Sequence, residues 1–344
     1  MSSIKLVACS TRSEKFILQK SLGQGTSAEV WRAQYRGREV ALKIFKPYTS
    51  VSNPLGDRAA PILWVEECKV LQRIKSSGGQ ACANVINFLG ASEEEFYANL
   101  GNVYGGYYSR HYIMIDPFSE EDALEKMKDI LEGLKFLHYH RIHHRDMKPE
   151  NILIKRLDNN RFSLLITDFG LATILEGNVA VGKQTCTLGY EAPEILDPRF
   201  VSIDYKTDVF AAGVILWYML RLCHPFYDKG YNKEYIHDYI VKNKYTISLN
   251  QLRSSEEIKN FLRRLLDWDP RERYSARKAL SDKIYNRNRT NGVGGWPAPV
   301  QRPSRSNSIQ VENYPRAPQK KIYNEHNETK ITLSESSPSI PELR

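Results

Sequence analysis

Cysteine is scarce in this sequence and follows no pattern. The 344 residues include five cysteines, an odd number, with no C-x-x-C spacing among them (Cys9, Cys68, Cys82, Cys186 and Cys223). Structural zinc sites and disulfide frameworks depend on closely and regularly spaced cysteines, so the sequence argues against both. Scattered single thiols are instead typical of proteins in a reducing compartment. We expect a cytoplasmic location and leave the nucleus open.

Long hydrophobic runs are missing as well. The longest, VFAAGVILWYML at 209–220, is bounded by Asp208 and Arg221, and it is shorter than the ~20 apolar residues that span a bilayer. It predicts a buried core helix. The N-terminal residues, MSSIKLVACS, lack the basic start and the apolar core of a secretory signal. We therefore expect no membrane span and no secretory signal.

No block of like charge dominates the chain. The formal net charge is +9, but lysine and arginine are spread along the sequence and the aromatic residues are dispersed. This distribution predicts a solvated surface of mixed sign and no specific nucleic-acid partner. A hydrophobic content of 41% and a charged content of 26% indicate a globular protein. The chain is long enough for two lobes with extra segments.

The first part of the chain has the pattern of a small sheet with one helix. Residues 14–46 alternate between apolar and polar side chains, which predicts two or three antiparallel strands. The run AAPILWVEECKVLQRI that follows has helical spacing and one broad apolar face (Ile62, Val65, Val70, Leu71 and Ile74). Two further strands are predicted around 84–92 and 110–116, joined by a loop at 98–109.

From about residue 119 the pattern changes to long helices. The first begins with Ser119 followed by acidic residues. This favours a helix N-terminus, because a serine hydroxyl accepts a backbone N–H there and acidic groups complement the helix dipole. After residue 285 the composition shifts to Pro, Ser, Asn, Gly and charge without periodicity. We predict that 286–344 is a largely disordered basic tail.

The stretch LGQGTSAEVW, residues 22–31, nearly spells a glycine-rich loop that closes over nucleotide phosphates. Gly23 and Gly25 allow the backbone to turn sharply and to approach phosphate oxygens, whereas Ala28 stands where that pattern has a third glycine. Taken alone, the stretch is equally typical of an ordinary tight hairpin.

A lysine and a glutamate further along the chain are candidates for an ion pair at the phosphates. Lys43 lies in VALK, on the strand that returns from the hairpin, and its partner is predicted to be Glu67 on the following helix. Glu66 is the alternative, because neighbouring helix positions point in different directions. Taken alone, a lysine at this position is more often a solvated strand residue.

The stretch IHHRDMKPENILI, 142–154, is far more specific. It places Asp146, Lys148 and Asn151 in one short loop: a carboxylate to accept a hydroxyl proton, a cation for the transferring phosphoryl group and an amide oxygen for a metal ion. Asp168 follows in ITDFGLA and offers the hard oxygen ligand that Mg²⁺ prefers. The strands NILI and LLIT are predicted to form a hairpin between these groups. TLGYEAPEIL and TDVFAAG come later.

In this order and at these separations, the motifs resemble those of the eukaryotic-type protein kinases, serine/threonine branch. The resemblance implies an α+β, bilobal protein-kinase fold with a small β-rich N-lobe carrying one helix and a larger, mainly helical C-lobe. The implied organisation is an N-terminal extension, a kinase domain of two lobes and the disordered tail (1–13; 14–285, with lobes 14–116 and 119–285; 286–344).

The resemblance also implies a role for each site residue. Asp146 is the catalytic base, assisted by Lys148 and Lys43, while Asn151 and Asp168 hold Mg²⁺. The ATP-binding residues are taken to be Leu22, Gly23, Gly25, Val30, Ala41, Lys43, Glu67, Asp116 and Phe118. In this reading Asp116 and Phe118 are the hinge residues whose backbone binds adenine. The short interval from this hinge to His144 then indicates that the small helix after the hinge is reduced or missing.

The implied activity is transfer of the γ-phosphate of ATP to serine or threonine hydroxyls of protein substrates, with Mg²⁺, in intracellular signalling. Lys148 and Thr187 indicate the serine/threonine branch. A nucleotide-binding pseudokinase scaffold and a small-molecule kinase are the alternatives. The tail contains Ser308 in RPSRSNSIQ. Its phosphorylation is predicted to recruit a phospho-dependent partner, unless the tail is only a spacer.

Overall fold

A computed structural model gives the fold. It describes residues 6–8, 15–24, 28–45, 59–77, 82–91, 95–99, 103–104, 117–157, 161–175, 187, 189–197, 203–225, 249 and 252–285. The chain divides into two units, 1–298 and 299–344, and all described residues belong to the first. The predicted tail therefore lies outside the described residues.

The first part of the chain forms an antiparallel sheet. Its strand order is β1-β2-β3-β4-β6-β5, with the bounds Leu6–Ala8 (β1), Lys15–Gln24 (β2), Ala28–Tyr35 (β3), Arg38–Phe45 (β4), Phe88–Ala91 (β5) and Glu95–Asn99 (β6). The turn between β3 and β4 has positive φ at Arg36 and Gly37 (49° and 74°), as a two-residue hairpin turn requires. Phe16, Val40 and Leu42 are buried in a small core of this sheet.

The strand next to β4 differs from the prediction. β4 pairs with β6, with Lys43 opposite Phe96, although the sequence pattern placed the last strand at 110–116, which lies outside the described residues. Ala98 and Asn99 are weak strand formers, so the sequence gives little sign that β6 extends into the predicted loop. Strand β1, which pairs Leu6 with Ile17, was not predicted either.

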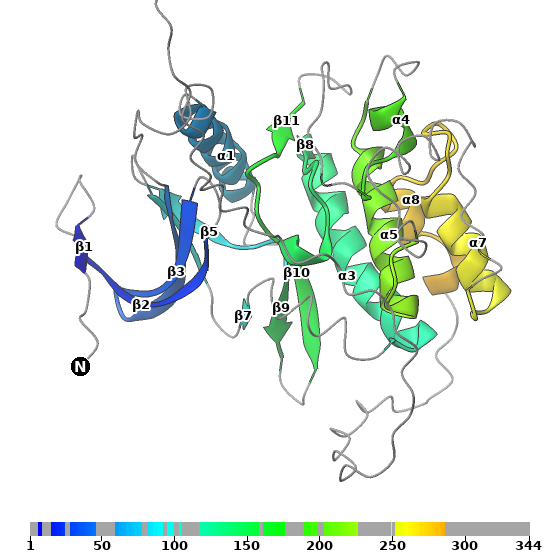
Figure 1. The fold of residues 1–344 in the computed structure, drawn as a ribbon, viewed down its shortest axis with the longest axis horizontal. Coiled ribbons are helices and arrows are strands. Elements are labelled where there is room, and N and C mark those ends of the chain that lie inside the picture. The colour runs from blue at the N-terminus through cyan, green and yellow to red at the C-terminus, as the bar shows by residue number, and fades with distance from the viewer. Residues whose placement is uncertain are drawn as a thin grey trace, which may run out of the picture. The chain divides into compact units, whose positions relative to one another are not determined.

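Helix α1, Ala59–Ser76, follows the sheet and packs against β5 (Figure 1). Val70, Leu71 and Ile74 are buried as predicted, and Glu67 lies on the same buried face. Val65 is 39% exposed, so its predicted place on the apolar face is wrong. It precedes Val70 by five positions, which turns it well away from the buried stripe at 100° per residue.

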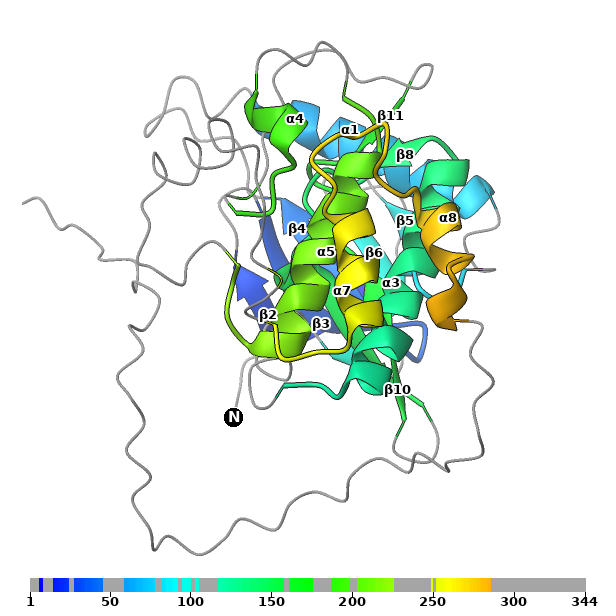
Figure 2. The same ribbon diagram turned by 90° about the vertical axis from the view of Figure 1, so that its right-hand side faces the viewer.

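Helices dominate the second part of the chain: α3 (Glu120–Tyr139), α4 (Pro193–Leu196), α5 (Lys206–Arg221), α7 (Glu256–Leu265) and α8 (Ala276–Leu280), with the short 3-10 turns η2 (Pro149–Asn151) and η4 (Lys283–Tyr285). Helices α3 and α5 lie side by side, and α7 packs against α5 (Figure 1, Figure 2). The Ser119 hydroxyl accepts the Asp122 N–H at the start of α3, which confirms the predicted N-terminus. No described helix has the length and apolarity needed to cross a membrane.

Helix α5 is the predicted buried core helix. Every side chain from Thr207 to Trp217 is buried, so the polar Asp208 in its first turn is enclosed by protein. The remaining short strands are β7 (Val103–Tyr104), β8 (Ile142–His143), β9 (Ile152–Arg156), β10 (Phe162–Ile166) and β11 (Thr173–Ile174). β9 and β10 form the predicted hairpin, with Ile152 opposite Ile166. Asn151 and Asp168 both lie just beyond the open end of this hairpin, where β9 begins and β10 ends.

Candidate active site

Lys43 lies at the centre of an ion-pair network. Its Nζ is 2.8 Å from both carboxylate oxygens of Glu67 and 3.2 Å from Asp168 Oδ1. Glu67 is only 2% exposed, whereas Glu66 is exposed and contacts Lys69 at 2.7 Å. The partner of Lys43 is therefore the predicted Glu67 and not the alternative Glu66. The sheet, α1 and the segment after β10 each contribute one of the three charged groups.

Lys43 and Asp168 favour each other's charged forms, whereas burial raises the pKa of Glu67 to about 7 despite the neighbouring Lys43. Burial alone lowers the pKa of Lys43, but the carboxylates of Glu67 and Asp168 outweigh burial and hold that pKa above its usual value. Burial raises the pKa of Asp168, and Lys43 overrides this effect and keeps the pKa below its usual value. Near neutral pH the site therefore presents a lysine cation beside an aspartate anion.

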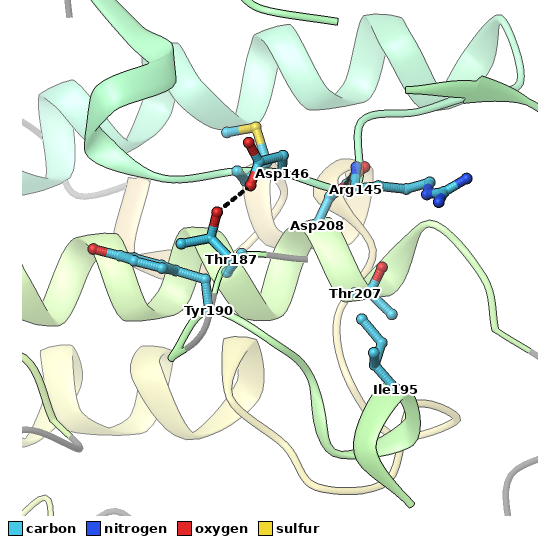
Figure 3. A pocket seen from close by; sticks show the side chains of 9 residues that line it. Arg145, Asp146, Thr187, Tyr190, Ile195, Thr207 and Asp208 are labelled. Carbon is cyan, nitrogen blue, oxygen red and sulfur yellow. Dashed lines mark hydrogen bonds between the residues drawn. The ribbon is translucent and has the colours of Figure 1, made fainter. Parts of the chain in front are cut away.

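Asp146, Lys148 and Thr187 form a second cluster. The Thr187 hydroxyl donates to Asp146 Oδ1 at 2.5 Å, and Lys148 Nζ donates to the Thr187 oxygen at 2.8 Å. Lys148 Nζ also lies 2.7 Å from Asp146 Oδ2. In Figure 3 the Thr187 hydroxyl points at the Asp146 carboxylate. These contacts hold both oxygens of Asp146 in one orientation.

Asn151 is placed so that its amide oxygen remains available. Its Nδ2 donates to the Asp146 carbonyl oxygen at 2.7 Å and to Asp146 Oδ2 at 2.9 Å, which leaves Oδ1 as the acceptor. The Asp168 side chain is 50% exposed. The described residues contain no cluster of three or more His, Cys, Asp or Glu suited to a metal. One carboxylate and one amide oxygen fit Mg²⁺, which usually binds few protein ligands together with substrate phosphates.

The backbone is strained at two positions of this site. Arg145 and Asp168 have φ values of 68° and 61°, a region that costs a residue with a Cβ atom ~1–2 kcal/mol. Asp208 stabilises the first of these turns, because its Oδ2 accepts the His144 N–H at 2.9 Å and its Oδ1 accepts the Arg145 N–H at 2.8 Å. Such strain is typical of functional sites held in place by their surroundings.

The glycine-containing stretch forms a hairpin between β2 and β3. Gly23 pairs with Val30, and Val30 pairs with Lys43 on β4. A Cβ atom at Gly23 would meet no atom within 4 Å, so the backbone there is open to a ligand. Ala28 is buried in the sheet, where its methyl group is accommodated. Gly25 lies outside the described residues.

Leu22 and Ala41 lie close to this hairpin in the sheet. Leu22 precedes Gly23 on β2 and its side chain is exposed. Ala41 lies on β4, two residues before Lys43, and pairs with Ala98 of β6. Leu22 and Ala41 therefore lie on β2 and β4, the two strands that flank β3.

One of the two predicted hinge residues, Phe118, uses its backbone N–H within the protein. The Phe118 N–H donates to the Met219 carbonyl oxygen at 2.9 Å near the end of α5, so it is not available to adenine. Asp116 lies outside the described residues. After β6 ends at Asn99, the next described strand is β7, which pairs with β9. The predicted hinge contact of Asp116 and the short interval that follows it stay predictions, because 105–116 lie outside the described residues.

Glu194 and Arg273 form a buried ion pair. Arg273 Nη1 and Nη2 are 2.5 and 2.8 Å from the two carboxylate oxygens of Glu194, and both residues are almost fully buried. This bidentate pair joins α4 to the segment before α8. Its role is structural, because removing one partner would leave the other as a buried charge.

Comparison with known proteins identifies the family of this chain. The sequence profile described as "Protein kinase domain" matches residues 16–284. The chain belongs to the protein kinase family. The predicted α+β fold, with a β-rich lobe carrying one helix and a mainly helical lobe, is thereby confirmed.

Several protein kinases resemble this one. It is 32% identical over 267 residues to calcium-dependent protein kinase 4 of Plasmodium falciparum, covering 76% of this chain and 47% of the relative. Identity is 31% over 269 residues to the serine/threonine-protein kinase cds1 of Schizosaccharomyces pombe (76% and 56%). It is 32% over 271 residues to the serine/threonine-protein kinase H1 homolog of Danio rerio (77% and 60%). The matches thus span about half of each relative.

This kinase domain should lose stability in mild acid. Burial lowers the pKa of His143 to about 4 and that of His224 to about 3. In the unfolded chain both titrate near pH 6.5. The unfolded state therefore binds more protons as the pH falls from 6.5 toward 4, and stability present above pH 6.5 is lost through that window.

Each histidine is expected to lower the free energy of unfolding by about 2 kcal/mol between pH 7 and pH 5. Urea unfolding at pH 7, 6 and 5 measures this loss. His143→Gln, which cannot titrate, should show a flatter dependence than the wild-type chain. Equal slopes for the two proteins would contradict the assignment to His143.

Proposed function

We propose that this chain is a serine/threonine protein kinase, which transfers the γ-phosphate of Mg²⁺-bound ATP to hydroxyl groups of protein substrates in intracellular signalling. The observation that carries the proposal is the cluster of Lys148 and Thr187 around the Asp146 carboxylate. It combines a base for the hydroxyl proton with a cation for the phosphate at one point, which phosphoryl transfer requires.

The base is Asp146. Its carboxylate is oriented by Thr187, Lys148 and Asn151, so one lone pair can accept the proton of a substrate hydroxyl as the oxygen attacks phosphorus. Lys148 lies beside that point and offsets the negative charge that develops on the transferred group. The proton of the substrate hydroxyl is therefore transferred directly to the Asp146 carboxylate.

The nucleotide is assigned to the cleft side of the N-terminal sheet. Lys43, held by Glu67, would bind the α- and β-phosphates, while Gly23 and Gly25 would cover them. Apolar surface for the base and sugar would come from Leu22, Val30 and Ala41. We assign the backbone contact with adenine to the predicted hinge at Asp116, a residue outside the described part of the chain.

Mg²⁺ is assigned to Asn151 and Asp168. Their oxygens form a hard donor set beside the phosphate-binding lysine. When bound, the metal neutralises phosphate charge and orients the phosphoryl group for in-line transfer. Lys43 keeps Asp168 ionised, so the ligand remains charged near neutral pH.

The hydroxyl class is tested with three peptide pools that differ only in the acceptor, which is serine, threonine or tyrosine. We expect phosphate in the serine and threonine pools, because Lys148 and Thr187 resemble the serine/threonine branch and two of the relatives are named serine/threonine-protein kinases. Mass spectrometry of the pools after incubation with Mg²⁺ and ATP measures the products. Transfer to the tyrosine pool alone would contradict the assignment.

The cellular setting remains part of the proposal. We assign the chain to the cytoplasm, with the nucleus open, and propose protein substrates without a nucleic-acid partner. A phospho-dependent partner of the tail, recruited through Ser308, is a further proposal about a segment that lies outside the described residues. Neither the site geometry nor the relatives favour the pseudokinase alternative.

A further inference from the structure

His143 is a buried histidine that the proposed chemistry does not use. It lies on β8, where it pairs with Thr173 of β11, and its side chain is fully buried. Its Nε2 is 2.6 Å from Thr207 Oγ1 and 3.6 Å from Asp208 Oδ1. Nδ1 has no hydrogen-bond partner among the described residues. The ring therefore makes its polar contacts through one nitrogen, directed at the first turn of α5.

The hydrogen-bond directions in this contact follow from its neighbours. The Thr207 hydroxyl donates to the Asp204 carbonyl oxygen at 3.2 Å, and its single hydrogen is thereby used. It must accept from His143, so Nε2 carries the proton. A lone pair on Nε2 would also face the Asp208 carboxylate, which disfavours the other tautomer. The imidazole N–H therefore donates to the Thr207 hydroxyl, and that hydroxyl donates to the Asp204 carbonyl oxygen before α5.

Other hydrogen bonds also hold the first turn of α5: the Lys206 N–H donates to Asp204 Oδ1 at 2.6 Å, and Arg273 Nη1 donates to the Lys206 carbonyl oxygen at 3.2 Å. The N-cap residue of this helix, Tyr205, makes no side-chain capping bond. Thr207 is bonded back to Asp204, and the next residue is Asp208, whose carboxylate accepts the His144 and Arg145 amides. Because the Asp208 carboxylate accepts both amides, a shift of this turn would move them as well. They directly precede the proposed base, Asp146.

We propose that His143 and Thr207 are a positioning pair for the catalytic loop. The hydrogen bond between them ties β8 to the first turn of α5 and so fixes where the Asp208 carboxylate holds the backbone before Asp146. The pair touches neither substrate nor nucleotide. Its catalytic effect rests on the proposed kinase function, whereas its effect on the Asp208-bound amides does not.

Loss of the pair should lower kcat without weakening nucleotide binding. A small displacement of a catalytic group is costly, with ~10²-fold lost for about 1 Å, and other bonds to Asp208 limit the displacement here. His138 Nε2, for example, remains 3.0 Å from Asp208 Oδ2. We therefore expect about a 10-fold decrease in kcat, with the KM for ATP within about twofold of wild type because Lys43 and Glu67 lie elsewhere.

The experiment compares five variants of the full chain with wild type. His143→Leu and Thr207→Val remove the two ends of the hydrogen bond, and the double variant removes both. His143→Gln and Thr207→Ser are matched controls, because glutamine keeps a donor at about the reach of Nε2 and serine keeps the hydroxyl. The readouts are kcat, the KM for ATP and hydrogen exchange of the His144 and Arg145 amides.

The proposal predicts equal losses of kcat in the two single variants and no further loss in the double variant. Both controls should return kcat to within about threefold of wild type. The two amides should exchange faster in the single variants than in the controls. If His143→Leu does not fold, the nearly isosteric Thr207→Val decides alone.

Wild-type kcat and exchange in Thr207→Val would overturn the proposal. So would losses that multiply in the double variant, since independent sites contribute separately. If the wild-type chain has no activity, the proposed function fails, and the exchange rates still test the pair. Faster exchange at the two amides then supports it, and unchanged exchange overturns it.

Discussion

Replacing Asp146 with asparagine is expected to lower kcat by about 10²–10⁴-fold, which is the usual contribution of a positioned general base. Asparagine keeps an oxygen that can accept from Thr187 but has no charge with which to take a proton. Its amide group would also face Lys148, which now lies 2.7 Å from a carboxylate oxygen. Steady-state kinetics at saturating substrate measures the loss.

ATP binding should be nearly unchanged in this variant, because the Lys43 network is formed by other residues. Isothermal titration with ATP checks that point. Glu132→Gln, which removes a partly exposed carboxylate on α3, is the control for loss of one negative charge and should keep wild-type turnover. Wild-type turnover in Asp146→Asn would show that another group is the base.

Replacing Asp168 with asparagine is expected to reduce metal-dependent turnover by about 10²–10³-fold, because a bound metal contributes several kcal/mol of charge stabilisation. Asparagine retains one oxygen ligand without the charge. The Lys43 ammonium also loses a contact at 3.2 Å, although both of its contacts with Glu67 remain. Turnover as a function of Mg²⁺ concentration measures the effect.

The metal dependence separates this prediction from simple damage to the site. The half-saturating concentration of Mg²⁺ should rise in Asp168→Asn, whereas it should stay at the wild-type value in Asp146→Asn. Binding of ATP in the absence of metal should be similar in all three proteins. An unchanged half-saturating concentration in Asp168→Asn would contradict its assignment as a metal ligand.

The catalytic loop could be predicted from the sequence because its geometry is local. Asp146, Lys148 and Asn151 lie within six positions, and the hairpin of β9 and β10 brings Asp168 back beside them. Glu67 could be chosen over Glu66 from helix periodicity once one face of α1 was known to be apolar. In each case sequence spacing and secondary structure alone determine which groups meet.

The strand that pairs with β4 could not be predicted in this way. HYIMIDPF has a stronger strand pattern than EFYAN, yet β4 pairs with EFYAN, because pairing depends on contacts between segments distant in sequence. The hydrogen bond between His143 and Thr207 joins residues 64 positions apart. Both lie in motifs quoted above, IHHRDMKPENILI and TDVFAAG, but the spacing of these motifs does not show that the two side chains meet.

The central claim is that this chain transfers phosphate and does not merely bind nucleotide. The most direct test is to incubate the full chain with Mg²⁺, γ-labelled ATP and a generic protein substrate, beside Asp146→Asn at the same concentration. The account predicts label on serine or threonine residues of the substrate with the wild-type chain and only background with the variant. Binding of ATP by the wild-type chain with no transfer above the level of Asp146→Asn would contradict it.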